Sequence, residues 1–187
     1  MSERKVFVIS DTHFLHENIV KYTGRPENHT ELIIDNWNRV VSDDDLVFHL
    51  GDFSAGVKGR TDELSEIANS LKGEKILIRG NHDHYKADKY IEKYGFSDVF
   101  DHLIIDDLMM IHFPLEFHEH LRGESWSILK GYESLAKKSG VRYIVHGHTH
   151  NRNTGLPGHY NCSVEQIDFT PIELNKLLEG ERFGKYQ

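Results

Sequence analysis

Cysteine is almost absent from this 187-residue sequence, as are long hydrophobic runs and any excess of positive charge. The single thiol, Cys162, excludes an intramolecular disulfide and suits a reducing compartment. The apolar runs are only as long as strands, so neither a signal-peptide core nor a membrane-spanning helix is predicted. A formal net charge of −8 argues against a broad basic face for a nucleic-acid backbone. These absences predict a cytoplasmic protein with no membrane partner, and they argue against nucleic acid as a partner.

The length and composition suit a single domain spanning residues 1–187. A chain of this size buries roughly 70% of the surface that its unfolded form exposes, so a complete core needs no disulfides. Hydrophobic residues make up 38% of the chain and charged residues 28%, which is ordinary for a globular protein. No repeat, low-complexity tract or linker-like stretch marks a domain boundary.

Short apolar runs predict strands, and amphipathic stretches between them predict helices. Apolar residues at i, i+3, i+4 and i+7 predict a helix over 61–71, and a similar stripe covers 33–41. A short helix is predicted over 88–94, and a capping box at 170–173 predicts a last helix to about Leu178. Alternation of strands and helices predicts an α/β layered domain. The predicted strands are 6–9, 46–49, 75–78, 103–105, 108–112 and 143–146.

Metal-binding residue types gather where these strands end. In layered α/β folds the carboxyl ends of strands line one crevice, so distant segments can project side chains into one place. Histidine and carboxylate ligands without thiolate suit Mn, Fe, Zn or Ni. An aspartate that bridges suits two such ions about 3.5–4 Å apart. The residues found at these strand ends are Asp11, His13, Asp52, Asn81, His82, Asp83, His112, His148 and His150.

Three glycines separate the strands from these residues. Gly51, Gly80 and Gly147 each lie between a predicted strand and a candidate ligand, where the chain must turn sharply. A β-carbon at such a position would obstruct a close approach of the backbone. The glycines therefore predict tight packing of the turns around the site.

Five short motifs follow one another along the chain: Asp11-x-His13, Gly51-Asp52, Gly80-Asn81-His82-Asp83, His112 and Gly147-His148-Thr149-His150. Together and in this order, they resemble the complete signature of the calcineurin-like metallophosphoesterases. Any one of them is common, but five in order are very specific. The resemblance implies a four-layer αββα sandwich of two mixed β-sheets flanked by helices, which periodicity alone does not give. It also implies hydrolysis of a phosphate ester by attack of a metal-bridging hydroxide.

The resemblance further implies which residues bind two ions. The first ion would be held by Asp11, His13, Asp52 and His150. The second would be held by Asp52, Asn81, His112 and His148, so Asp52 bridges. His82 matches the family's non-ligand histidine, which contacts the phosphate or protonates the leaving group. The implied cofactor is a pair of divalent transition-metal ions, with manganese the first candidate and iron, zinc or nickel the others.

Polar residues near the motifs are candidates for substrate contact or support. Arg79 could face the phosphate or form a salt bridge. His16 and Asn18 lie on the loop after the first motif and could reach substrate. Asp83 either sets the local turn or orients His82. By strand alternation, two further histidines are predicted to be packed or hydrogen-bonded neighbours of the motifs, not ligands: they are His49 and His146.

The segment 114–131 has no clear period. It contains His118, Glu119, His120, Arg122 and Trp126. Because it follows His112 directly, it is either a loop or cap over the metals that selects substrate, or a solvated surface excursion.

Hydrolysis of a small soluble phosphate ester is the favoured function, and a diester is favoured over a monoester. A monoester dianion carries one more negative charge and calls for more cationic donors. Superfamily protein phosphatases resemble Gly-Asp-x-Val-Asp-Arg-Gly at the second motif, where this chain has Ala55 and Gly56 in place of the later Asp and Arg. Arg79 favours a monoester instead, because Arg-Gly-Asn-His also resembles those phosphatases. Nucleotide-derived diesters are the first candidates, and Trp126 or Phe53 would stack on a base if either faces the pocket.

Three alternatives remain open. The first is a phosphomonoesterase or protein phosphatase. The second is a nuclease, which is opposed by the acidic charge and by the lack of basic clusters with interleaved aromatics. The third is a binding module that keeps the fold without catalysis, and it is opposed by the presence of a match at every ligand position and at His82.

Overall fold

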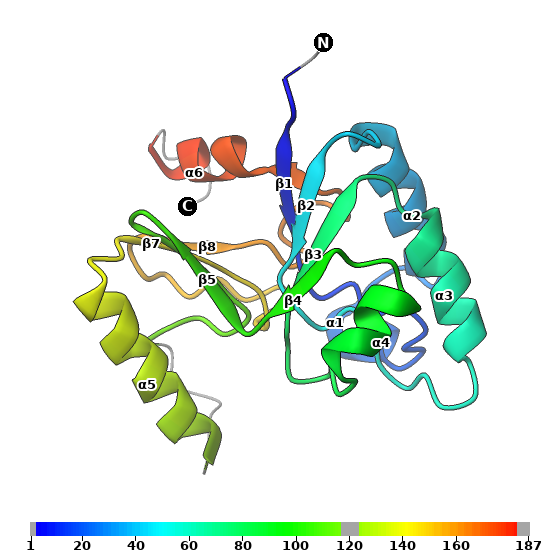
Figure 1. Ribbon diagram of the computed structural model, residues 1–187, viewed down its shortest axis with the longest axis horizontal. Coiled ribbons are helices and arrows are strands. Elements are labelled where there is room, and N and C mark those ends of the chain that lie inside the picture. Colours follow the sequence, from blue (N-terminus) through cyan, green and yellow to red (C-terminus); the bar gives the residue numbers. More distant parts are fainter. Residues whose placement is uncertain (1–2, 117–123, 183–187) are drawn as a thin grey trace.

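Four parallel strands from residues 6–100 and one later strand build the first sheet, in the order β4-β3-β2-β1-β9. The computed structural model describes residues 3–116 and 124–182 (Figure 1). β1, β2, β3 and β4 are parallel, and β9 pairs antiparallel with the free edge of β1, so the sheet is mixed. Its strands are β1 (Val6–Ile9), β2 (Leu46–His49), β3 (Glu74–Ile78), β4 (Asp98–Phe100) and β9 (Ile172–Glu173).

The second sheet has four strands in the order β5-β6-β7-β8. β5 (His102–Ile105) pairs antiparallel with β6 (Leu108–Ile111), because only a short turn joins them. β7 (Tyr143–His146) and β8 (His159–Asn161) continue the sheet in parallel with β6. This sheet is therefore mixed as well.

Helices cover the outer sides of both sheets (Figure 1). α2, α3 and α4 lie on the outer side of the first sheet, and α5 lies on the outer side of the second. None of the helices that the structure describes is both long and apolar enough to cross a membrane. The helices are α1 (Ile19–Thr23), α2 (His29–Val40), α3 (Thr61–Ser70), α4 (Ala87–Glu92), α5 (Glu124–Lys138) and α6 (Leu174–Arg182).

Alternation along β1 divides the core between the layers. Phe7 and Ile9 point to the outer face, where they belong to a buried cluster with Trp37 of α2 and Leu64 of α3. Val8 points the other way, into the cluster between the sheets. Burial of each large apolar side chain in such clusters stabilises the fold by about 1.5–3 kcal/mol.

The remaining layers are defined by β6 in the same way. Met110 faces the first sheet, in the cluster that also holds Val145 and, from α6, Leu177. Met109 faces outward and packs in a third cluster with Leu129 of α5. The order of layers is helices, sheet, sheet, helix, and this confirms the αββα sandwich implied by the resemblance.

The predicted last helix begins later than its capping box indicated. Ile172 and Glu173 form β9 and pair with Val8 and Phe7, so the helix starts only at Leu174. Thr170 donates its hydroxyl to the carbonyl of Asp168, 2.9 Å away, and not to a helix terminus. The prediction was wrong because pairing with the open edge of β1 outweighed the local capping signal.

The segment 114–131 is not one irregular excursion, because α5 begins at Glu124. Four residues singled out in it (His118, Glu119, His120 and Arg122) lie outside the described residues, as does the side chain of Trp126. The other boundaries are closer to prediction. The helix predicted over 88–94 spans Ala87–Glu92, and β3 extends the predicted strand by one residue at its start.

Candidate metal centre

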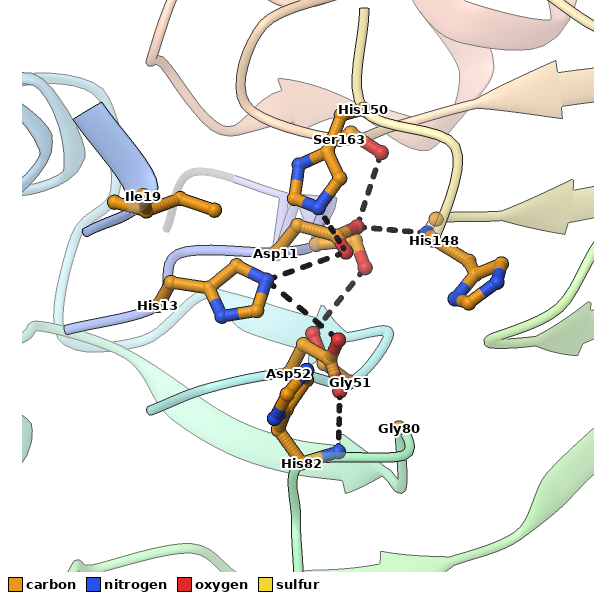
Figure 2. A network of polar contacts seen from close by, with 12 residues as sticks. Asp11, His13, Ile19, Gly51, Asp52, Gly80, His82, His148, His150 and Ser163 are labelled. Atoms are coloured by element: carbon orange, nitrogen blue, oxygen red, sulfur yellow. Dashed lines mark hydrogen bonds and ion pairs between the residues drawn. The ribbon is translucent and has the colours of Figure 1, made fainter. Parts of the chain in front are cut away.

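The turns after the parallel strands meet where the two sheets touch. Within each sheet, parallel neighbours bring their carboxyl ends to the same edge. Between the sheets, the Ser10 N–H donates to the Cys162 carbonyl at 2.9 Å, and the Val164 N–H donates to the Ser10 carbonyl at 3.1 Å. Within the second sheet, the Gly147 N–H donates to the His112 carbonyl at 3.0 Å and joins the ends of β6 and β7. The polar residues after β1, β2, β3, β6 and β7 therefore converge on one site. Figure 2 shows those that follow β1, β2, β3 and β7.

Asp11, His13 and His150 form one group of possible metal ligands, the first triad, whose ligand atoms lie within 4.8 Å of one another. Oδ2 of Asp11 accepts hydrogen bonds from the Ser163 hydroxyl at 3.0 Å and the His148 N–H at 2.9 Å. Oδ1 is left to face the Nε2 atoms of His13, 3.9 Å away, and His150, 3.8 Å away. Figure 2 shows both rings directed at this carboxylate.

Asp52, His112 and His148 form the second triad, within the same 4.8 Å limit. His112 donates its Nδ1–H to the Leu50 carbonyl at 2.8 Å, so its Nε2 is the ring nitrogen that faces the site. This Nε2 lies 3.5 Å from Oδ2 of Asp52 and 3.2 Å from Oδ1 of Asn81. The structure therefore places Asn81 beside the second triad.

One oxygen of Asp52 lies between the triads. Oδ2 is 3.6 Å from Nε2 of His13 and 3.5 Å from Nε2 of His112. Oδ1 accepts the backbone N–H of His82 at 2.8 Å, which holds the carboxylate in this orientation. The position of Oδ2 is the one required of a bridging ligand.

Unsatisfied polar atoms show that the site fits cations. Within the described part of the chain, Oδ1 of Asp11 and both ring nitrogens of His13 are buried without a hydrogen-bond partner. Such atoms are rare in folded proteins because desolvation without a partner is costly. A divalent ion coordinated by carboxylate and imidazole would satisfy Oδ1 of Asp11 and Nε2 of His13, the ring nitrogen that faces this carboxylate.

Burial and neighbouring charges shift the pKa values of the ionisable groups at the site. Burial raises the pKa of the Asp11 carboxyl. Burial alone would lower the pKa of His112, but the negative charge of Asp52 outweighs it and raises the value to about 9. Burial lowers the pKa of His148 to about 3, so that ring is neutral and ready to ligate. A metal that binds His112 must therefore displace a proton.

Five of the seven predicted ligands have backbone conformations that L-residues disfavour. Each has a positive φ, which costs about 1 kcal/mol or more for a non-glycine residue. Strain of this kind gathers where surrounding structure holds side chains for a function. The residues are Asp11 (58°), His13 (47°), Asp52 (55°), His148 (68°) and His150 (50°).

The three glycines allow the close approach predicted for them. A β-carbon on Gly80 would lie 2.2 Å from Oδ1 of Asp52, and one on Gly147 would lie 2.3 Å from Oδ2 of Asp11. A β-carbon on Gly51 would lie 2.4 Å from the Gly80 nitrogen. These distances are too short for non-bonded atoms, so the prediction of tight turns is confirmed.

Gly80→Ala is therefore expected to destabilise the fold by about 1–3 kcal/mol, as overpacking does, and to weaken Mn binding by displacing Asp52. Gly131→Ala is the matched control, because its new methyl would meet nothing within 4 Å on α5. The control is expected to be neutral or up to about 1 kcal/mol more stable. Chemical denaturation and Mn titration check both variants. Equal stability and Mn binding in the two would contradict the packing argument.

Asp83 sets the turns around the bridging carboxylate. It accepts backbone N–H groups from Asp52 at 2.7 Å, Gly80 at 2.8 Å and Phe53 at 3.2 Å. The Tyr90 hydroxyl donates to it at 3.3 Å. Of the two predicted roles, these contacts support the turn-setting one.

His49 and His146 are buried neighbours of the motifs, as predicted. Nδ1 of His49 accepts the Gly51 N–H at 3.3 Å, so its Nε2–H donates to the Thr12 hydroxyl at 2.9 Å. His146 donates its Nδ1–H to the Gly147 carbonyl at 2.8 Å. Both side chains thus support the turns that carry the candidate ligands.

A cavity of about 590 Å³ opens over the triads. Of the predicted substrate contacts, His16 and His82 line it, whereas Asn18 is exposed at the start of α1 and is not among the described lining residues. Arg79 does not line it either, and its Nη1 lies 3.8 Å from Oδ1 of Asp101. Lining residues that sequence reasoning missed are Ile19, Tyr22, Thr23, Asn151 and Arg152.

Comparisons with known proteins give the family of the chain. Residues 5–164 match the calcineurin-like phosphoesterase superfamily domain. An uncharacterized protein of Methanocaldococcus jannaschii is 34% identical over 197 residues, which cover 99% of this chain and 96% of that protein. The Gene 66 protein of Mycobacterium phage L5 is 27% identical over 168 residues, which cover 76% of this chain and 75% of that protein.

A solved structure has the same fold. A protein of unknown function from Aquifex aeolicus superposes with a TM-score of 0.78 at 27% identity, covering 95% of this chain and 99% of that one. The chain belongs to the calcineurin-like phosphoesterase superfamily. Members of this superfamily are generally metal-dependent phosphoesterases, and this chain carries two candidate metal-binding triads.

Proposed function

We propose that this protein is a dinuclear metal phosphoesterase that hydrolyses a small phosphodiester. The observation that carries the proposal is the pair of triads sharing Oδ2 of Asp52 beneath an open cavity. Asp11, His13 and His150 would hold one ion, His112, His148 and Asn81 the other, and Asp52 both. When bound, the ions neutralise charge on the phosphoryl oxygens and supply the nucleophile.

His82 is proposed to protonate the leaving group. Its backbone N–H is held by Oδ1 of Asp52, and its exposed side chain lines the cavity. The ring lies 5.3 Å from that of His13 and 6.3 Å from that of His16, measured between centroids. As the ester P–O bond breaks, the leaving oxygen takes the imidazolium proton, so no free alkoxide has to form.

The distribution of cationic side chains supports a diester over a monoester. Among the described residues that line the cavity there is one arginine, Arg152, and no lysine. Arg79 is engaged near Asp101, and Arg25 is buried against Glu165. A monoester dianion would therefore have fewer cationic partners than its charge calls for.

Hydrolysis of bis-nitrophenyl phosphate is expected to exceed that of nitrophenyl phosphate in kcat/KM by about tenfold or more. A missing hydrogen bond to a charged oxygen costs about 1.5–3 kcal/mol, and about 1.4 kcal/mol is tenfold in rate. Both substrates are assayed at the same Mn concentration and pH. Asp52→Asn is the control for contaminating phosphatases, since it should abolish both activities. A preference for the monoester that Arg79→Ala removes would make the protein a phosphatase instead.

A nucleotide-derived diester is the proposed substrate class, with a base-stacking residue other than those predicted. Phe53 is fully buried in the core and contacts Phe14 edge to face, so it does not face the cavity and the condition for stacking on a base is not met. Tyr22 lines the cavity with 73% of its surface exposed, and its ring stands 6.2 Å from that of His16. An exposed aromatic face at this place suits a base.

Tyr22→Ala is expected to lower kcat/KM for thymidine 5′-nitrophenyl phosphate about fivefold, since an aromatic contact is worth about 1 kcal/mol. Ethyl nitrophenyl phosphate has the same leaving group but no base, and its kcat/KM should not change. Tyr22→Phe keeps the ring and serves as the matched control. Equal losses on both substrates would remove Tyr22 from base recognition.

A further inference from the structure

A buried ion pair lies behind His150, outside all five motifs. The side chain of Arg25 is fully buried and that of Glu165 is 7% exposed. Nε and Nη2 of Arg25 approach the same oxygen, Oε1 of Glu165, at 2.8 and 2.7 Å. Burying two charges costs several kcal/mol per ion, which their attraction offsets only when further hydrogen bonds complete the geometry. The other contacts of the pair are therefore informative.

Arg25 holds the turn that carries two residues of the first triad. Its Nη1–H donates to the Thr12 carbonyl at 3.0 Å, and its Nη2–H donates to the Asp11 carbonyl at 2.6 Å. Asp11 and His13, on either side of Thr12, both have positive φ. The guanidinium thus fixes a turn whose backbone is strained.

Glu165 holds the third member of the first triad. Nδ1 of His150 lies 3.1 Å from Oε1 and 3.4 Å from Oε2 of Glu165. Nη2 of Arg25 also lies 3.4 Å from this Nδ1. Oε1 of Glu165 is the closer neighbour and a carboxylate can only accept, so Nδ1 carries the proton and Nε2 is directed at Oδ1 of Asp11, 3.8 Å away. A carboxylate on the far nitrogen of a metal-binding histidine orients the ring and increases its basicity as a ligand.

We infer that Arg25 and Glu165 are a positioning pair that selectively supports binding of the ion held by the first triad. The inference rests on the proposed metal-binding function. Arg25 sets the turn of Asp11 and His13, while Glu165 sets the ring of His150. In the second triad, the ring of His112 is oriented by the Leu50 carbonyl and not by the pair.

The test compares Mn binding by variants of the pair, with free Mn measured by electron paramagnetic resonance. Removing one partner leaves the other as an uncompensated buried charge, so the main variant replaces both, Arg25→Met with Glu165→Met. It is expected to bind one ion as the wild type does and the other about 10–100-fold more weakly. Adding His148→Ala to it should then weaken the remaining ion.

Two single variants complete the series. Glu165→Gln keeps the shape and an acceptor oxygen but not the charge, so a smaller loss at the same ion is expected. Glu173→Gln is the matched control, because Glu173 also pairs with lysines but lies on β9, away from the site. It should bind both ions normally.

Each outcome decides between the inference and the proposal beneath it. If the wild type binds fewer than two ions, the metal-binding proposal fails. If it binds two and the double variant also binds two with unchanged affinity, only the positioning role fails. If the double variant binds both ions more weakly by the same factor, the role is overturned as well, because the pair is inferred to support only the ion of the first triad. If the double variant does not fold, as judged by its circular dichroism melt, Glu165→Gln decides. If Glu165→Gln then binds both ions as tightly as the control Glu173→Gln does, the inference is overturned.

Discussion

Replacing Asp52 with Asn is expected to weaken both metal ions at once and to remove hydrolysis. Oδ2 of Asp52 lies about equally close to His13 and His112, so its negative charge serves both triads. Loss of an outer-shell partner typically costs 10–100-fold in metal affinity, so loss of the bridging ligand should cost more than about 100-fold at each site. The fold should survive, because the amide oxygen of Asn can still accept the His82 N–H. Mn titration and circular dichroism measure the two effects.

Single-site variants provide the comparison for Asp52→Asn. His13→Ala should chiefly weaken the ion of the first triad, and His148→Ala that of the second. Asp43→Asn, on the exposed turn before β2, is the control for removal of one negative charge. If Asp52→Asn lost only one ion while keeping the other at wild-type affinity, Asp52 would not be the bridge.

Replacing His82 with Ala is expected to lower kcat about 10²–10⁴-fold without changing metal content. The contact of His82 with Asp52 runs through its backbone N–H, which the substitution leaves in place. The loss should be greatest for a poor leaving group, such as the phenolate of diphenyl phosphate. It should shrink for nitrophenolate, which leaves without a proton.

His84→Ala is the matched control for His82, since His84 is an exposed histidine whose ring lies 6.3 Å from that of His82. Its kcat should equal that of the wild type on both substrates. An equal loss in His82→Ala for good and poor leaving groups would exclude the acid role and leave phosphate binding as the role of His82.

The candidate ligands were predictable because two local signals coincide at them. Each follows a short apolar strand, and parallel strands deliver their carboxyl ends to one edge. Gly51, Gly80 and Gly147 added a steric signal, and the distances around them show why no larger residue fits. The layered architecture came only with the family resemblance, since strand periodicity does not say which face meets which sheet.

Features that depend on tertiary pairing were not predictable. The capping signal at Thr170 was real locally, but the unpaired edge of β1 captured Ile172 and Glu173. Arg25 and Glu165 lie far apart in sequence and in no recognisable spacing, so only the fold shows that they meet. Nothing in the sequence distinguishes Tyr22 from an ordinary helical residue, and only the fold shows that it lines the cavity.

Positive φ at the ligands was also invisible in the sequence. Glycine adopts a left-handed conformation most easily, and although Asp and His are enriched there among the other residues, glycine would be expected first. Function explains the exception, because glycine carries no ligand. The strain is held by the surrounding hydrogen bonds, including those that Ser163 and His148 donate to Asp11.

The metal content of the reconstituted wild-type protein tests the central claim most directly. The purified chain is stripped with chelator, loaded with excess Mn, freed of unbound metal by gel filtration and analysed by mass spectrometry against protein concentration. The two triads with their shared aspartate predict two ions per chain. A content of one ion, or of none, would contradict the dinuclear centre.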